Sequence, residues 1–231
     1  MKIFLIQLLS MVVTFTAQGQ KSDSLKVPEP KSFITNHQGT YHKIAVRYRA
    51  EAKEVYLTDD KANPVASIWS VSYLRTDVPD GEPRPVVFVF NGGPGSASIW
   101  LHMGFLGPRR VLVDSDANQD DGAAPYPVVA NEQCLLDIAD LVFIDPVGTG
   151  FSKAIGKGKD ETFWGLREDA RSVAQFIRLW TTGHNRWMSP KYIIGESFGT
   201  TRAAAVTAAL EQGGQDLALN GLILISQALD Y

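Results

Sequence analysis

The sequence Gly195-Glu196-Ser197-Phe198-Gly199 places a serine between two glycines, where one structural pattern gives way to another. An apolar run ends directly before it, and an alanine-rich helical pattern begins directly after it. A serine on a sharp strand-to-helix turn is typical of nucleophilic catalysis, because small neighbours let the backbone take the strained turn. The helix that follows would direct its free N–H groups at the reaction centre. The alternative interpretation is a serine that caps a helix.

A glycine-rich segment could supply hydrogen-bond donors for the negatively charged oxygen that forms in acyl transfer. The sequence NGGPGSAS, residues 91–98, follows an apolar run that ends at Phe90. Around a catalytic serine turn, one donor comes from such a loop and one from the residue after the nucleophile. The candidates are the backbone N–H groups of Gly93 and Phe198. A phosphate-binding loop is the alternative, but the segment lacks the Lys-Ser/Thr ending and the Gly-x-Gly-x-x-Gly spacing.

A serine nucleophile also needs a base, and the sequence does not supply one in the expected order. The fold with this serine turn uses the chain order Ser, then Asp or Glu, then His. All four histidines precede Ser197, and the only aspartates that follow it are Asp216 and Asp230. We therefore expect the domain to be incomplete at its C-terminus, with the catalytic Asp and His beyond Tyr231. If the chain truly ended at Tyr231, a non-catalytic peptide-binding protein would be the alternative.

The elements that would position these residues follow from the spacing of the apolar residues. Continuously apolar runs predict strands buried on both faces at 85–90, 141–145, 191–195 and 222–226. A helical pattern places on one face Leu166, Ala170, Val173, Ile177 and Trp180, and a second helix is predicted at 200–214. Runs rich in valine and tyrosine predict antiparallel strands at 41–50, 53–59 and 66–75. The sequence thus predicts an α/β fold with a mostly parallel, doubly wound sheet and antiparallel N-terminal strands.

Residues 1–19 have the composition of a secretory signal peptide. Lys2 precedes an uncharged run, residues 3–17, that is shorter than the about 20 residues needed to span a bilayer. Small residues at Ala17 and Gly19 suit a cleavage site. Residues 20–40 are expected to form a flexible mature N-terminus, and residues 41–231 the folded domain. We expect a secreted or periplasmic protein with no stable membrane association after signal cleavage.

Charge and composition argue against several classes of ligand. The net charge of −3 offers nothing to attract nucleic acid or an anionic membrane. The single cysteine, Cys134, cannot form an internal disulfide. Residues 114–122 contain acidic and amide side chains at calcium-loop spacing, but Gln119 stands where glycine is required and Pro125 where glutamate is required. We expect neither a metal nor a cofactor.

Three motifs in this order resemble those of the serine carboxypeptidase family: NGGPGSAS at 91–98, FIDPVGTGFS at 143–152 and IIGESFG at 193–199. The resemblance runs from about Tyr41 to the end of the chain and corresponds to the first half or so of a typical member. It implies an α/β-hydrolase fold and the removal of C-terminal residues from peptides, often at acidic pH.

The resemblance also assigns roles to individual residues. It implies that Ser197 is the nucleophile and that Gly93 and Phe198 donate the oxyanion N–H groups. It further implies that Asn91 and Glu196 hold the terminal carboxylate of a peptide substrate. Two carboxyl groups so close together cannot both ionise cheaply, so they would share a proton, and this favours acidic pH.

Several positions depart from the family pattern. Phe105 stands where the family commonly has a second glutamate for the carboxylate clamp, and Arg109 or Arg110 could take that role. Ser96 replaces a common cysteine, and the FIDPVG segment lacks one residue after its aspartate. These departures leave open an esterase, an aminopeptidase or an acyltransferase of the same fold.

Three further polar residues are expected to have structural roles. Ser152 should shape the floor of the active site without reacting. His102 should be a hydrogen-bonded structural histidine near the glycine-rich loop, and His184 should lie in a surface loop.

Overall fold

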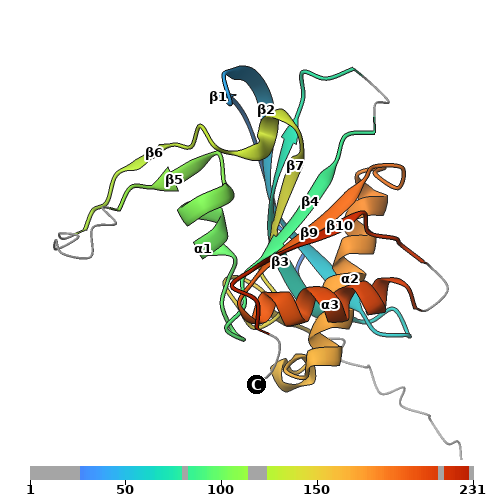
Figure 1. The fold of residues 1–231 in the computed structure, drawn as a ribbon. Coiled ribbons are helices and arrows are strands. Elements are labelled where there is room, and N and C mark those ends of the chain that lie inside the picture. The colour runs from blue at the N-terminus through green and yellow to red at the C-terminus, as the bar shows by residue number, and fades with distance from the viewer. Residues whose placement is uncertain (1–26, 80–82, 114–123, 213–215, 229–231) are drawn as a thin grey trace, which may run out of the picture.

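The computed structural model describes residues 27–79, 83–113, 124–212 and 216–228. Its main feature is an eight-stranded mixed sheet with the order β1-β2-β3-β7-β4-β9-β10, in which the short β8 pairs with β3 (Figure 1). The strands are β1 (Ser32–Tyr41), β2 (Ile44–Thr58), β3 (Pro64–Arg75), β4 (Val86–Phe90), β7 (Asp140–Ile144), β8 (Lys153–Ala154), β9 (Lys191–Glu196) and β10 (Gly221–Ile225). A separate two-stranded sheet consists of β5 (Arg109–Val111) and β6 (Val128–Ala130). The predicted signal peptide and the loop at 114–122 lie outside the described residues.

The parallel core of the sheet confirms the strands predicted from continuously apolar runs. β4 is parallel to both β7 and β9, and β10 is parallel to β9. Every residue of β4 and β7 is buried, because these central strands are covered on both faces. β10 forms as predicted, but its predicted burial on both faces is wrong: it is the last strand of the described sheet, and Leu222, Ile223 and Leu224 are exposed on it.

The N-terminal strands are antiparallel, as predicted, but their boundaries differ from the prediction. Most of the runs at 41–50 and 53–59 lies in one continuous strand, β2, which pairs with β1 on one side and β3 on the other, whereas Tyr41 ends β1 and residues 42–43 form the turn. Residues 32–40, which we expected to be flexible, form most of β1. Their side chains are mostly exposed and carry no apolar alternation, so the sequence gives no strand signal. Backbone pairing with β2 along the whole of β1, from Ser32 with Lys53 to Tyr41 with Ile44, holds β1 in place.

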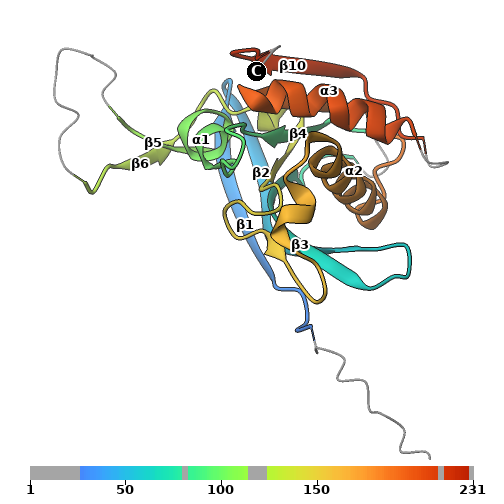
Figure 2. The same ribbon diagram turned by 90° about the horizontal axis from the view of Figure 1, so that it is seen from below.

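Helices lie on both faces of the sheet, in agreement with the doubly wound arrangement. The long helices α2 (Leu166–Gly183) and α3 (Phe198–Leu210) lie side by side on one face (Figure 2). The opposite face is covered by short helical turns, which are α1 (Ile99–Leu101), η1 (His102–Leu106) and η2 (Leu135–Asp137). The chain connections from β7 to β9 and from β9 to β10 move across the sheet toward its β10 edge. The connection from β4 to β7 moves the opposite way, toward the β1 edge. Right-handed crossovers therefore place the two sets of helices on opposite faces.

The predicted apolar face of α2 is largely confirmed. Ala170, Val173, Ile177 and Trp180 are buried in the core, whereas Leu166, in the first turn, is 38% exposed. A short 3-10 helix, η3 (Asp160–Phe163), precedes α2. The helix predicted at 200–214 begins at 198 and ends at 210. No helix among the described residues is both long enough and apolar enough to span a membrane.

Candidate active site

Ser197 lies on the sharp turn between β9 and α3, with backbone angles of φ 56° and ψ −126°. A non-glycine residue with these angles is strained, which costs about 1–3 kcal/mol. The flanking glycines permit the turn, because a Cβ atom on Gly195 would collide with the backbone oxygen of Gly199. The helix-cap interpretation is not supported, since α3 begins without a hydrogen bond from the Ser197 side chain.

The glycine-rich loop after β4 packs directly against this serine turn. A Cβ atom on Gly92 would lie 2.5 Å from the backbone nitrogen of Phe198 and 2.6 Å from the backbone oxygen of Glu196. Gly93 has a φ of 105°, a backbone conformation that residues other than glycine rarely adopt. The structure therefore brings together the two segments that carry the predicted N–H donors, Gly93 and Phe198. The role of Gly92 in this close approach has no signal in the sequence, because it depends on a contact with a distant segment.

Asn91 and Glu196, the two residues expected to hold a substrate carboxylate, are hydrogen-bonded to each other. The Asn91 Nδ2 group donates a hydrogen bond to Glu196 Oε2 over 3.1 Å, although the two residues are 105 positions apart. Asn91 is buried, and its Oδ1 accepts a hydrogen bond from the backbone N–H of Leu101 at 3.0 Å. Asn91 thereby links the serine turn to α1. Glu196 is half-buried and so keeps access to solvent.

Phe105, which stands at the position of the missing glutamate, lies on η1 and is 56% exposed. Trp100 on α1 is 71% exposed, so the helical segment after the glycine-rich loop carries two large exposed aromatic side chains. Arg109 donates to the backbone oxygen of Val128 on the neighbouring strand β6, 2.9 Å away. The guanidinium is therefore engaged in the β5–β6 sheet.

Ser152 and His102 are both held by hydrogen bonds to other parts of the chain, which fits structural roles for the two residues. The Ser152 hydroxyl donates to the backbone oxygen of Asp145 at 2.6 Å and accepts from the N–H of Trp69 at 2.7 Å. The His102 Nε2 atom is 2.7 Å from the Tyr73 hydroxyl, and the His102 ring is stacked on an aromatic neighbour. Burial lowers the pKa of His102 to about 4, so the ring is neutral near pH 7.

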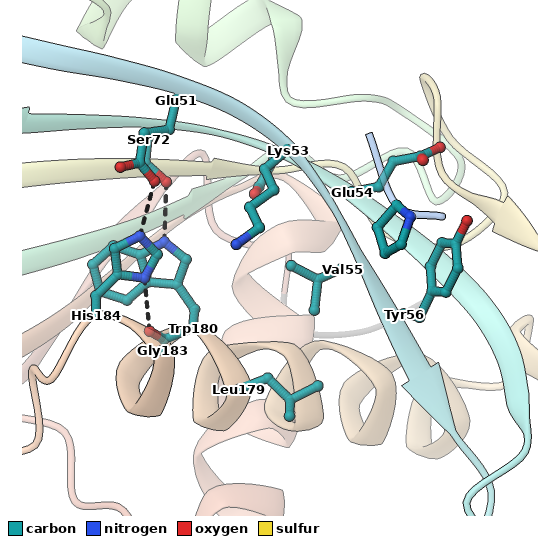
Figure 3. A pocket seen from close by; sticks show the side chains of 12 residues that line it. Glu51, Lys53, Glu54, Val55, Tyr56, Ser72, Leu179, Trp180, Gly183 and His184 are labelled. Carbon is teal, nitrogen blue, oxygen red and sulfur yellow. Dashed lines mark hydrogen bonds and ion pairs between the residues drawn. The ribbon is translucent and has the colours of Figure 1, made fainter. Parts of the chain in front are cut away.

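The prediction for His184 is wrong, because the residue ends α2 and packs into the protein. Its ring stacks on Trp180 with 4.1 Å between the ring centroids, and Nδ1 is 2.9 Å from the Trp180 backbone oxygen (Figure 3). Nε2 is 3.0 Å from Oε2 of Glu51, a residue of β2 that is 133 positions earlier. This hydrogen bond lowers the pKa of Glu51 below its ordinary value. A sequence-local pattern could not show a partner so distant in the chain.

The residues that line the pocket beside His184 do not form a catalytic triad. It has a volume of about 240 Å³ between β2 and α2, and Glu51, Ser72 and His184 line it (Figure 3). The Ser72 hydroxyl accepts from the indole N–H of Trp180 at 3.0 Å instead of contacting the imidazole. The four histidines of the chain all have partners other than Ser197, which are Thr35 for His37, Asp137 for His42, Tyr73 for His102 and Glu51 for His184. The described residues contain no cluster of three potential metal ligands.

A buried arginine, Arg202, lies beneath the serine turn and is not among the site residues predicted from the sequence. Its Nε donates to Oδ2 of Asp169 on α2 at 2.6 Å, and its Nη1 donates to the backbone oxygen of Asn91 at 2.6 Å. Burial raises the pKa of Asp169 above its ordinary value, and the Arg202 charge opposes this shift. The signal available in the sequence was one charged residue in an otherwise apolar helical segment, TTRAAAV.

A family model described as serine carboxypeptidase matches residues 69–230. The chain belongs to the serine carboxypeptidase family. Its relatives include serine carboxypeptidase-like 16 of Arabidopsis thaliana, which is 27% identical over 157 residues. They also include the pheromone-processing carboxypeptidase KEX1 of Saccharomyces cerevisiae, which is 28% identical over 137 residues. These matches cover 64% and 59% of this chain, but 34% and 16% of the respective relatives.

The solved structure of the yeast prohormone-processing carboxypeptidase KEX1 has the same fold. It superimposes with a TM-score of 0.60 at 21% sequence identity, covering 77% of this chain and 38% of that structure. The fold is therefore the α/β-hydrolase fold, with a parallel core and antiparallel N-terminal strands, as predicted. The chain spans between 16% and 38% of the length of these relatives.

Proposed function

We propose that this chain is the N-terminal portion of a serine carboxypeptidase that hydrolyses C-terminal peptide bonds through an acyl-enzyme on Ser197. The observation that carries the proposal is the strained conformation of Ser197, at φ 56° between a buried strand and a helix, with a glycine-rich loop packed against it. Backbone strain of this kind is concentrated at functional sites. Family membership indicates the same reaction class.

In this reaction the Ser197 hydroxyl attacks the scissile carbonyl carbon while a histidine base accepts its proton. The N–H groups of Gly93 and Phe198 stabilise the oxyanion that forms. The C–N bond then breaks, the base returns the proton to the leaving amine, and water hydrolyses the acyl-serine. We expect the histidine and its orienting aspartate to come from residues beyond Tyr231, because no histidine follows Ser197 in these 231 residues.

Asn91 and Glu196 would hold the terminal carboxylate of a peptide substrate. Their contact at 3.1 Å orients the Glu196 carboxyl group at the serine turn. A carboxyl group binds a carboxylate when one of the two carries the shared proton, so we expect activity to favour acidic pH. The proposed substrates are peptides or proteins outside the cytoplasm, since residues 1–19 have the pattern of a secretory signal.

Phe105 is the observation that favours a second candidate function. An exposed phenyl ring at the clamp position cannot bind a carboxylate, and Trp100 extends this apolar surface. An esterase, an aminopeptidase or an acyltransferase would need no carboxylate clamp. A peptide and its C-terminal amide separate these candidates. A carboxypeptidase should cleave the free acid at least about tenfold faster, because the amide leaves the polar groups of the clamp unpaired.

The test of the proposed function uses the natural full-length protein. A serine-directed phosphonate should label Ser197, and the Ser197→Ala variant should be neither labelled nor active. Full peptidase activity without labelling at Ser197 would overturn the proposal. Reading the coding sequence past Tyr231 gives a first answer, because a stop codon there would favour the non-catalytic peptide-binding alternative.

A further inference from the structure

Arg202 is a fully buried cation in the first turns of α3, with 2% of its surface exposed. A buried charge is costly unless it is paired and hydrogen-bonded. Arg202 meets both requirements, because Nε donates to the Asp169 carboxylate and Nη1 donates to the backbone oxygen of Asn91, both at 2.6 Å. The cost is therefore offset by contacts to two separate segments of the chain.

The contacts of this side chain join the two halves of the proposed oxyanion site. Asn91 begins the loop that carries Gly93, which is one proposed N–H donor. The guanidinium carbon also lies 5.2 Å from the centroid of the Phe198 ring, and Phe198 supplies the other proposed donor. Asp169 belongs to α2, so the ion pair anchors both halves to the longest helix of the core.

The same residues line a cleft next to the glycine-rich loop. The cleft has a volume of about 250 Å³, and Pro94, Gly95, Phe198, Asp169 and Arg202 form part of its wall. The ion pair therefore lines the cleft beside the serine turn, and a change in its geometry would change the shape of that cleft.

We propose that Arg202, held by Asp169, is a positioning residue that fixes the Gly93 and Phe198 N–H groups relative to Ser197. This inference rests on the proposed function of Ser197. Oxyanion stabilisation depends on donors that are already in place, and a misplacement of about 1 Å can cost about 100-fold in rate. A guanidinium suits this task because it donates in two fixed directions from one rigid plane.

The test compares variants of the full-length protein by the rate of acylation per active site. Phosphonate labelling gives the fraction of labelled Ser197 and, separately, the rate constant of labelling at saturation. Arg202→Lys keeps the charge but cannot reach Asp169 and the Asn91 oxygen with the same geometry. Asp169→Asn keeps the hydrogen bond to Asn91 and removes the charge partner. Arg84→Lys is the matched control, since Arg84 pairs with the buried Asp140 at the opposite ends of the parallel strands.

The per-site rate constant should fall about tenfold or more in Arg202→Lys and by a smaller factor in Asp169→Asn. Arg84→Lys should lower the thermal midpoint and leave the per-site rate within about twofold of wild type. A purely structural ion pair would lower the labelled fraction and the thermal midpoint but not the rate constant of the molecules that remain folded.

Three outcomes would overturn the inference. The per-site rate could stay at the wild-type value in Arg202→Lys, or Arg84→Lys could lose as much rate as Arg202→Lys. If Arg202→Lys does not fold, an unchanged rate in Asp169→Asn overturns it. Failure of wild type to be labelled at Ser197 is a different result, because it removes the proposed function itself.

Discussion

Replacing Gly92 by alanine tests whether the glycine-rich loop must touch the serine turn. The added Cβ atom would lie 2.5 Å from the Phe198 nitrogen, 2.6 Å from the Glu196 oxygen and 2.7 Å from the Gly199 nitrogen. Ordinary contacts of a Cβ atom begin near 3.4 Å, so the loop and the turn must separate by about 0.9 Å. All three obstacles are backbone atoms, and no flexible side chain can move aside.

A separation of this size predicts a large loss of rate with little loss of folded protein. A misplacement of about 1 Å costs about 100-fold, which corresponds to about 2.7 kcal/mol of transition-state stabilisation. The assay is the saturating rate constant of phosphonate labelling at Ser197 in the full-length protein. Gly104→Ala is the control, because a Cβ atom there meets no atom within 4 Å. If the Gly92→Ala variant reacts within about threefold of wild type, the two segments need not be in contact for reaction, and the reasoning fails.

Three further predictions concern groups away from the serine turn. Glu51→Gln should cost about 1.5–3 kcal/mol of unfolding free energy near pH 7, because the carboxylate accepts a hydrogen bond from His184. The pKa of Glu51 is lowered in the folded state, so the contribution of this carboxylate to stability is present above the ordinary carboxyl pKa and is lost as the pH falls. In urea titrations, the unfolding free energy of the variant should therefore depend less on acidic pH than that of the wild type. An equal pH dependence would contradict this. Asp140→Ala should cost about 3–5 kcal/mol, because Arg84 and Arg186 would both lose their buried partner, and calorimetry should detect it without a change in per-site rate. Cys134 should resist iodoacetamide at pH 8 until the protein is unfolded, because burial raises the pKa of its thiol to about 12, and modification of the native protein on peptide mapping would refute this.

The parts of the fold that the sequence predicts are those with a local signal. Five consecutive buried residues define β4, and the change from an apolar run to a helical pattern locates the serine turn at Ser197. β1 has no such signal, because its exposed side chains carry no alternation and its order comes from backbone pairing with β2. The same pairing makes β2 one strand where composition predicts two.

The contacts that the sequence does not predict, in the candidate site and beside His184, all join distant segments of the chain. Glu51 and His184 are 133 positions apart, and Arg202 is 111 positions from the Asn91 oxygen that it contacts. Gly92 is one of several glycines in its loop, and only the folded chain shows that its Cβ position is occupied by the serine turn. Residue type and spacing indicate which groups can react, whereas the packing that holds them appears only in three dimensions.

The backbone angles of Ser197 explain why so much packing surrounds a single residue. A φ of 56° with a ψ of −126° lies outside the left-handed helical region that non-glycine residues visit in turns. Such a conformation persists only where neighbouring structure imposes it. Here the Ser197 N–H donates to the backbone oxygen of Ile225 on β10 at 3.0 Å. The backbone oxygen of Ser197 accepts from both the N–H and the hydroxyl of Thr200. Each such bond contributes about 1 kcal/mol, so together they are comparable to the strain that they maintain. The turn is therefore stable as a product of strand, helix and loop together, which is why weakening the loop contact at Gly92 should alter reactivity before it unfolds the protein.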